Sequence, residues 1–253
     1  MKRVLLTALF TAFAAPAPAA TVADGRAHLR AGNYAAAVQT GRYVDTNEGK
    51  LLAAEAMGAQ IMLNRADAVD TAKAALDLLD DVLEAEPDNA EALFLRALHQ
   101  GFRTRSSSKL AIVMGGLIGK TQDRIEAFAA AAPGDPRADA LRGAWHLGIV
   151  RAAGDGKFGA SLEEGLARYD AAVEALPGDM VVMSNYAFSL IVMDDASLRP
   201  RAKALLDRIA DTPATDALGE DTKARMMGLR EVWDDPDAVR ERARDLLNTE
   251  EAG

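Results

Sequence analysis

The sequence contains no cysteine, and this absence removes several classes of site. A disulfide framework, a thiolate metal centre and a cysteine nucleophile are all excluded. Aromatic residues make up only 5% of the chain, which disfavours sheets. Cations are outnumbered, with 29 Lys and Arg against 38 Asp and Glu and a net charge of −9. Because nucleic-acid binding requires clustered cations, no nucleic-acid partner is expected.

The residues that are present favour a helical protein with a buried core. Apolar residues make up 49% of the 253 positions and charged residues 26%, which excludes bulk disorder. Alanine is abundant and no stretch alternates clearly between apolar and polar residues, so helices are favoured over strands. The composition therefore predicts an all-α fold.

The first twenty residues have the pattern of a secretory signal. A short basic start precedes an apolar stretch over residues 4–15, and small residues follow it. This stretch of 12 residues is shorter than the ~20 that a spanning helix needs, which argues against a retained membrane anchor. Cleavage is expected after Ala19, with Ala17 and Ala20 as alternatives. We therefore predict a signal peptide over residues 1–19 and a periplasmic protein without a stable membrane span after cleavage.

A repeat is centred on Pro87, Pro133 and Pro177, which lie 46 and 44 residues apart and follow helical segments. Small or compact residues recur twelve residues before and ten residues after each proline, and a larger residue recurs eight before it. Small residues let two antiparallel helices approach closely. The positions are Ala75, Thr121 and Gly165; Leu79, Ile125 and Tyr169; and Ala97, Gly143 and Ala187.

These segments resemble tetratricopeptide repeats. The resemblance is carried by residues 32–37, 72–93 and 164–177, and it covers most of residues 22–211. The period departs from the ~34 residues of ordinary members, because extra residues fall between paired helices. The resemblance implies a right-handed superhelical stack of antiparallel helix pairs, an α-solenoid whose concave groove binds a protein or peptide partner.

The predicted domain organisation has three parts: the signal peptide at 1–19, helical repeats at 20–215, and capping helices with a frayed tail at 216–253. Local caps and apolar periodicity define eleven helices, the last of them broken near Asp235. They span residues 22–31, 34–44, 50–62, 67–85, 89–103, 108–131, 136–153, 161–175, 179–193, 198–211 and 216–247.

The segment over residues 115–121, with paired glycines before Gly119-Lys120-Thr121, has a superficial likeness to a nucleotide phosphate loop. Met114 stands where that loop requires glycine, and no strand precedes it, so phosphate binding is rejected. Leu110 to Ile118 is instead expected to lie in the core or an interface, with glycines that permit a kink. A small basic island before it is expected to be a solvated helix end, with an acidic partner tail as the alternative. It comprises Arg96, Arg103, Arg105 and Lys109.

No clustered catalytic or metal-binding set is evident in the sequence. His28, His99 and His146 are far apart and share no helical turn, so each is expected to serve packing or the surface. An enzyme would require at least two of them to converge with a carboxylate in one cleft. We therefore predict a non-catalytic protein with no metal and no cofactor.

Three segments within residues 93–98, 144–150 and 180–193 are apolar nearly all round, which suggests an apolar concave groove. Such a groove suits a partner helix, or a small apolar ligand that assists a membrane transport system. The alternatives are that the stack fills its own centre, or that the helix at 216–233 lies in the groove. The predicted groove residues are Phe94, Leu98, Ala144, Leu147, Ser184, Phe188 and Ile191.

Overall fold

The computed structural model describes residues 20–248. The signal-peptide prediction for 1–19, and nearly all of the expected tail, lie outside this range. The described residues form thirteen α-helices and one short 3-10 helix, and they contain no strand. The predicted all-α class is therefore confirmed for this part of the chain.

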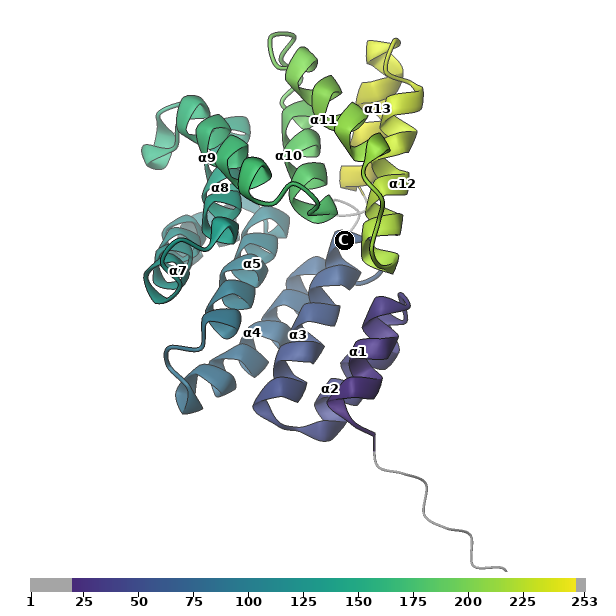
Figure 1. Ribbon diagram of the computed structural model, residues 1–253. Helices are drawn as coiled ribbons and strands as arrows, with labels where there is room; N and C mark the ends of the chain where they lie inside the picture. The colour runs from purple at the N-terminus through teal and green to yellow at the C-terminus, as the bar shows by residue number, and fades with distance from the viewer. Residues whose placement is uncertain (1–19, 249–253) are drawn as a thin grey trace, which may run out of the picture.

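The helices follow one another with short connections (Figure 1). They are α1 (Val22–Arg30), α2 (Tyr34–Val44), α3 (Asn47–Met62), α4 (Ala68–Ala85), α5 (Ala90–Ser106), α6 (Lys109–Gly115), α7 (Leu117–Ala131), α8 (Pro136–Ala153), the 3-10 helix η1 (Lys157–Gly159), α9 (Leu162–Ala175), α10 (Met180–Val192), α11 (Arg199–Asp211), α12 (Ala217–Glu231) and α13 (Pro236–Asn248).

Helix ends lie within three residues of their predicted positions, with one exception. The single helix expected over residues 108–131 is two helices, α6 and α7. Gly116 separates them with φ +59° and ψ +32°, a left-handed conformation that ends a helix and that glycine adopts without strain. The kink that the glycines were expected to permit is thus a complete break.

Side-chain caps explain why several helices begin where they do. The Asp135 carboxylate accepts the N–H of Arg137 at 2.9 Å, just before Pro136 starts α8. Asp235 accepts the N–H of Asp237 at the same distance at the start of α13. Ser161 accepts the N–H of Glu164 at 3.3 Å at the start of α9.

The helices pack mainly against their neighbours in sequence, as antiparallel pairs do. Contacts join α1 to α2, α3 to α4, α5 to α7, α8 to α9 and α10 to α11, and others join each pair to the next. A second series links α3 to α5, α5 to α8, α8 to α10 and α10 to α12. This sequential packing is consistent with a helical stack in which α3, α5, α8 and α10 form one layer.

All nine positions that recur at fixed distances from Pro87, Pro133 and Pro177 are buried, as expected. Gly143 on α8 lies so close to α9 that an added Cβ would be 2.6 Å from Cδ2 of Tyr169. Gly165 on α9 faces α8 in the same way, because an added Cβ there would lie 2.7 Å from Cδ2 of Leu147. Two glycines from opposite helices therefore allow α8 and α9 to approach more closely than any larger residues would.

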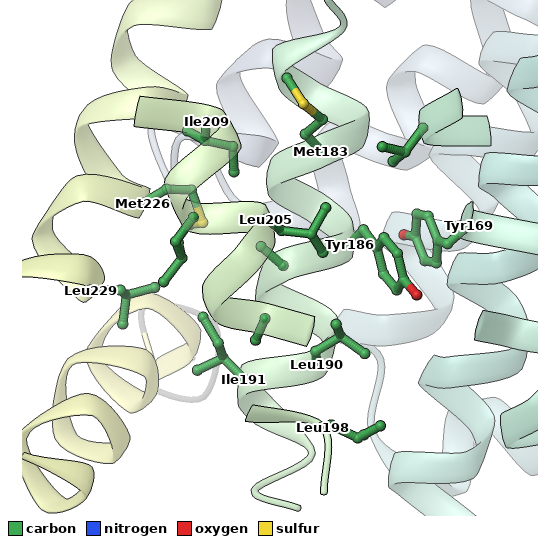
Figure 2. Packing of buried hydrophobic residues seen from close by; sticks show 14 of the residues in the cluster. Tyr169, Met183, Tyr186, Leu190, Ile191, Leu198, Leu205, Ile209, Met226 and Leu229 are labelled. Atoms are coloured by element: carbon green, nitrogen blue, oxygen red, sulfur yellow. The ribbon is translucent and has the colours of Figure 1, made fainter. Parts of the chain in front are cut away.

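The largest apolar cluster lies in the second half of the molecule, between α8 and α13. At one side of this cluster the rings of Tyr169 and Tyr186 stack 4.6 Å apart and nearly parallel (Figure 2). The hydroxyl of Tyr186 donates to Asp170 at 2.9 Å and accepts from Arg201 at 2.8 Å. The buried phenol is thus satisfied, and the stacked rings tie α9 to α10.

The C-terminal helices contact the N-terminal ones as well as the last helix pair. Arg225 on α12 donates to the carbonyl oxygens of Met62 and Leu63 at the end of α3. Asp221 on the same helix pairs with Arg65 at 2.8 Å. Figure 1 shows α12 reaching towards α1, and Leu218 packs in one apolar cluster with residues of α1, α2 and α3. The ends of the helical series are therefore joined through α12.

Replacement of Arg225 by leucine should loosen this junction. Hydrogen bonds from a charged donor each contribute about 1.5–3 kcal/mol, so amide exchange at the end of α3 and in α12 should accelerate about tenfold or more. Hydrogen–deuterium exchange followed by mass spectrometry measures this. Arg230→Leu is the control, because Arg230 lies on the same helix but pairs with Asp207 of α11. Equal acceleration in both variants would argue against a specific junction.

Gly143→Ala should lower the free energy of unfolding by about 1–3 kcal/mol, because the new methyl group overlaps Tyr169. Gly148→Ala is the matched control on the same helix, since nothing lies within 4 Å of its added Cβ. That substitution should stabilise the protein by about 0.5–1 kcal/mol through helix propensity. Urea denaturation of both variants measures the difference. If Gly143→Ala were neutral, the close approach of α8 and α9 would be misplaced.

Candidate functional site

The seven predicted groove residues are divided between the core and the accessible surface. Leu147, Ser184 and Ile191 are buried, and Leu147 and Ile191 belong to the largest core cluster. The other four lie on the inner layer of helices with part of their surface accessible. These are Phe94 and Leu98 on α5, Ala144 on α8 and Phe188 on α10.

Ala144 lies on the side of α8 that is turned away from its pair partner α9. Gly143 and His146 of α8 face α9, whereas Ala144 and Gly148, one turn apart, are exposed. On either side, α5 and α10 contact α8. We call the accessible surface formed by Phe94, Leu98, Ala144, Gly148, Asn185 and Phe188 the inner face.

Aromatic and polar groups frame the inner face. The ring of Phe94 lies 5.4 Å from that of Phe128, and the Arg137 guanidinium sits over it at 4.3 Å. The carboxylate of Glu91 holds Arg137 in place at 2.8 Å. A cation over an aromatic face is favourable. This end of the inner face therefore presents an aromatic surface with a charged rim.

Polar groups on α10 form a part of the site that sequence reasoning missed. Asn185 is exposed, and the hydroxyl of Ser189 one turn later donates to the Asn185 carbonyl oxygen at 2.7 Å. Burial raises the pKa of Tyr169 to about 12, so this phenol is neutral at physiological pH. The four-residue spacing of Asn185 and Ser189 on a largely apolar helix is the sequence signal that could have indicated a polar strip.

A pocket of about 280 Å³ lies on the other side of α8, between α7, α8 and α9. Its charged groups are joined to one another. Arg142 of α8 donates to Glu126 of α7 at 2.9 Å, and Arg168 of α9 pairs with Glu164 at 2.7 Å and with Asp139 of α8 at 2.9 Å. These ion pairs link the three helices around the pocket. Because both guanidinium groups already have carboxylate partners, the pocket is poorly suited to bind an anion.

The three histidines lie on α1, α5 and α8, and each has its own surroundings. His99 is buried, with Nε2 2.8 Å from the carbonyl oxygen of Ala54. Since a carbonyl only accepts, Nε2 carries the hydrogen. Nδ1 of His146 accepts the N–H of Ser161 at 3.0 Å, and burial lowers the pKa of this imidazole. His28 is partly exposed on α1. The structure therefore assigns local packing and hydrogen-bonding roles to His99 and His146.

Within residues 20–248, no group of three or more His, Asp or Glu side chains is placed to hold a metal ion. The same residues include no helix long and apolar enough to cross a membrane.

The apolar segment from Leu110 to Ile118 differs in part from its expected burial. Leu117 is buried and Ile118 packs against the cluster around Trp145. In contrast, Leu110, Val113 and Met114 are 72%, 75% and 80% exposed, so the expectation of a core position is wrong for α6. The alternative of an interface stays open for this helix.

Comparisons with models of protein families, with curated proteins and with solved structures found no match to this chain. The tetratricopeptide resemblance therefore remains a resemblance carried by the residues given above, and the arrangement of the helices supports it only at the level of sequentially packed pairs.

The pKa of His99 predicts a specific loss of stability in acid. Desolvation lowers this pKa from 6.5 to about 4, so the unfolded chain takes up the proton first. The contribution of neutral His99 to the free energy of unfolding is fully present above pH 6.5. It decreases by up to about 3 kcal/mol as the pH is lowered towards 4. Urea denaturation at several pH values measures the slope.

His99→Gln should flatten that slope, because a glutamine amide can still donate to Ala54 but does not titrate. His28→Gln, on the partly exposed surface of α1, is the control and should leave the slope unchanged. A slope that survives in His99→Gln would mean that another group is responsible.

Proposed function

We propose that this protein is a non-catalytic adaptor that binds a protein or peptide partner along the inner face. The exposed Ala144 and Gly148 of α8 carry the proposal. Small residues at the centre of the surface leave room for another chain, while Phe94 and Phe188 on the flanking helices supply apolar contact area. The Asn185 amide adds a donor and an acceptor for backbone groups of the partner.

The proposal includes a right-handed superhelical stack of tetratricopeptide-like repeats and export to the periplasm. Sequential pairing of helices and the buried proline register support the stack. The pattern of residues 1–19 supports export. A stack of this kind exposes one extended face of its inner helices, and that face is where its partners bind.

A binding role is favoured over catalysis by the surroundings of the histidines. His99 and His146 bind backbone groups, and they lie apart from each other on α5 and α8. An acid–base mechanism would require them to converge with a carboxylate in one cleft. His146 lines the pocket between α7, α8 and α9 together with Glu126 and Glu164, but its Nδ1 already accepts the N–H of Ser161.

The alternative of a small apolar ligand that assists membrane transport has less support. Leu147 and Ile191 fill the core between α8 and α13, so they do not line an enclosed apolar cavity. A partner that lies over the inner face makes use of the four predicted residues that remain accessible.

The proposal predicts that Ala144→Arg abolishes partner binding while the protein stays folded. The arginine would fill the centre of the inner face with a long charged side chain, and its position is exposed, so stability should change by less than about 0.5 kcal/mol. Affinity capture from envelope extract, analysed by mass spectrometry, measures binding.

Ala127→Arg on α7 is the matched control, because Ala127 is exposed on the outer layer. A partner that is recovered with the wild type and with Ala127→Arg, but lost with Ala144→Arg, supports the inner face. Equal recovery with all three proteins would contradict the proposal.

A further inference from the structure

The helix α6 exposes an apolar face that the proposed partner site does not use. Leu110, Val113 and Met114 follow one another at intervals of three and one residues, which places them on one side of a helix. They are three of the five large apolar side chains that are exposed in the described part of the chain. Exposed apolar side chains gathered on one short helix indicate a surface that is covered in use.

The break at Gly116 is what places this face outside the molecule. If α6 continued directly into α7, one helix would span residues 109–131. Instead the left-handed Gly116 changes the direction of the chain, and an added Cβ at Gly116 would meet nothing within 4 Å. Glycine is therefore required at position 116 by the left-handed turn and not by close packing. The fold thus presents α6 as a protruding apolar element.

A further exposed apolar side chain, outside α6, lies in the same region. Phe158 of η1 is 61% exposed and has φ +54°, which is unusual for a residue with a side chain. Two residues later, Ala160 packs in one cluster with Ile118, which follows the α6–α7 break by two residues. Figure 1 shows α7 and the connection from α8 to α9 on the same edge of the molecule.

The charges around α6 differ in sign from those of the rest of the chain. Residues 92–122 contain five cations and no acidic residue, although the whole chain has a net charge of −9. Arg96 in this stretch pairs with Asp80 of α4. Lys109 at the start of α6 and Lys120 in the first turn of α7 are both exposed. Lys157, beside Phe158, is exposed as well.

We propose that α6, with Lys109, Lys120 and the Lys157-Phe158 pair, is a docking site for the surface of an anionic phospholipid bilayer. Apolar side chains between lysines insert into the boundary between headgroups and acyl chains, while the cations remain at the level of the lipid phosphates. The rest of the chain is acidic, so an anionic surface attracts this region and repels the others. Docking through α6 leaves the inner face of α5, α8 and α10 available to a partner.

The absence of cysteine allows a direct test, because one introduced cysteine can be labelled uniquely. Val113→Cys in the full chain is labelled with a fluorophore that brightens and shifts to the blue in an apolar environment. The control is Tyr43→Cys on α2, where the native side chain is 72% exposed, comparable to the 75% of Val113. Each protein is mixed with vesicles of phosphatidylglycerol and phosphatidylcholine, or of phosphatidylcholine alone.

Docking through α6 predicts a blue shift at position 113 with the anionic vesicles only, reversed by high salt, and no shift at position 43. A shift with both lipid compositions, a shift at both positions, or no shift would each overturn the proposal. A shift at position 113 that depends on protein concentration without vesicles would show that a second copy of the chain covers α6, and it would also overturn the proposal.

Charge reversal tests the contribution of the lysines separately from the apolar contacts. Lys109→Glu with Lys120→Glu should weaken binding to anionic vesicles about tenfold or more, because each cation near an anionic surface contributes to binding. Lys73→Glu with Lys203→Glu makes the same change in net charge on α4 and α11, where the two lysines pair with Asp70 and Asp207. Equal weakening by both double variants would show a nonspecific charge effect and would overturn the assignment to α6.

Discussion

Close contact between paired helices depends on small residues that face the partner helix. In the pair α8–α9, Gly143 meets the ring of Tyr169, and Gly165 meets Leu147. Each glycine makes room for a large side chain from the opposite helix, so the two helices interlock through a glycine on each side. Ala97 and Ala187 occupy the equivalent places on α5 and α10 and are fully buried. The spacing of successive pairs, and therefore the positions of the inner helices, follows from these contacts.

The junction through α12 adds a constraint that sequential pairing lacks. In an open series of helix pairs, each pair contacts only its neighbours, and bending between pairs is resisted by single interfaces. Here Arg225 binds the end of α3, and Asp221 binds Arg65 beside it. A bend along the series would have to break these contacts. The inner helices are thus held from both ends, which favours a preorganised face over one that forms on binding.

Two surfaces with different chemistry result from this arrangement. The inner face combines small residues of α8 with aromatic rings from α5 and α10, and it is the proposed site of a polypeptide partner. The α6 region combines an exposed apolar face with lysines, and it protrudes beyond the stack because Gly116 interrupts the helix. The two surfaces lie on separate helices. Under the two proposals above, the protein would hold a partner near a membrane surface.

The amino-acid sequence by itself determined the fold class, nearly all helix boundaries and the buried register, because these depend on local interactions. Caps such as Asp135, prolines and the periodicity of apolar residues act within a few residues along the chain. The accessible residues of the predicted groove were harder to predict, since the sequence of a helix that is apolar all round does not reveal which side faces solvent. Leu147 and Ile191 are therefore core residues, while Ala144 and Phe188 remain accessible.

Only the tertiary structure decided how distant segments meet. The contact of α12 with α3 joins residues about 160 positions apart, as between Arg225 and Met62, and no local pattern encodes such a pairing. The same holds for α6: its apolar sequence predicts burial, and its exposure depends on the single backbone conformation at Gly116. Local physical chemistry specified the helices, whereas contacts between distant helices and one left-handed residue decided which surfaces face outward.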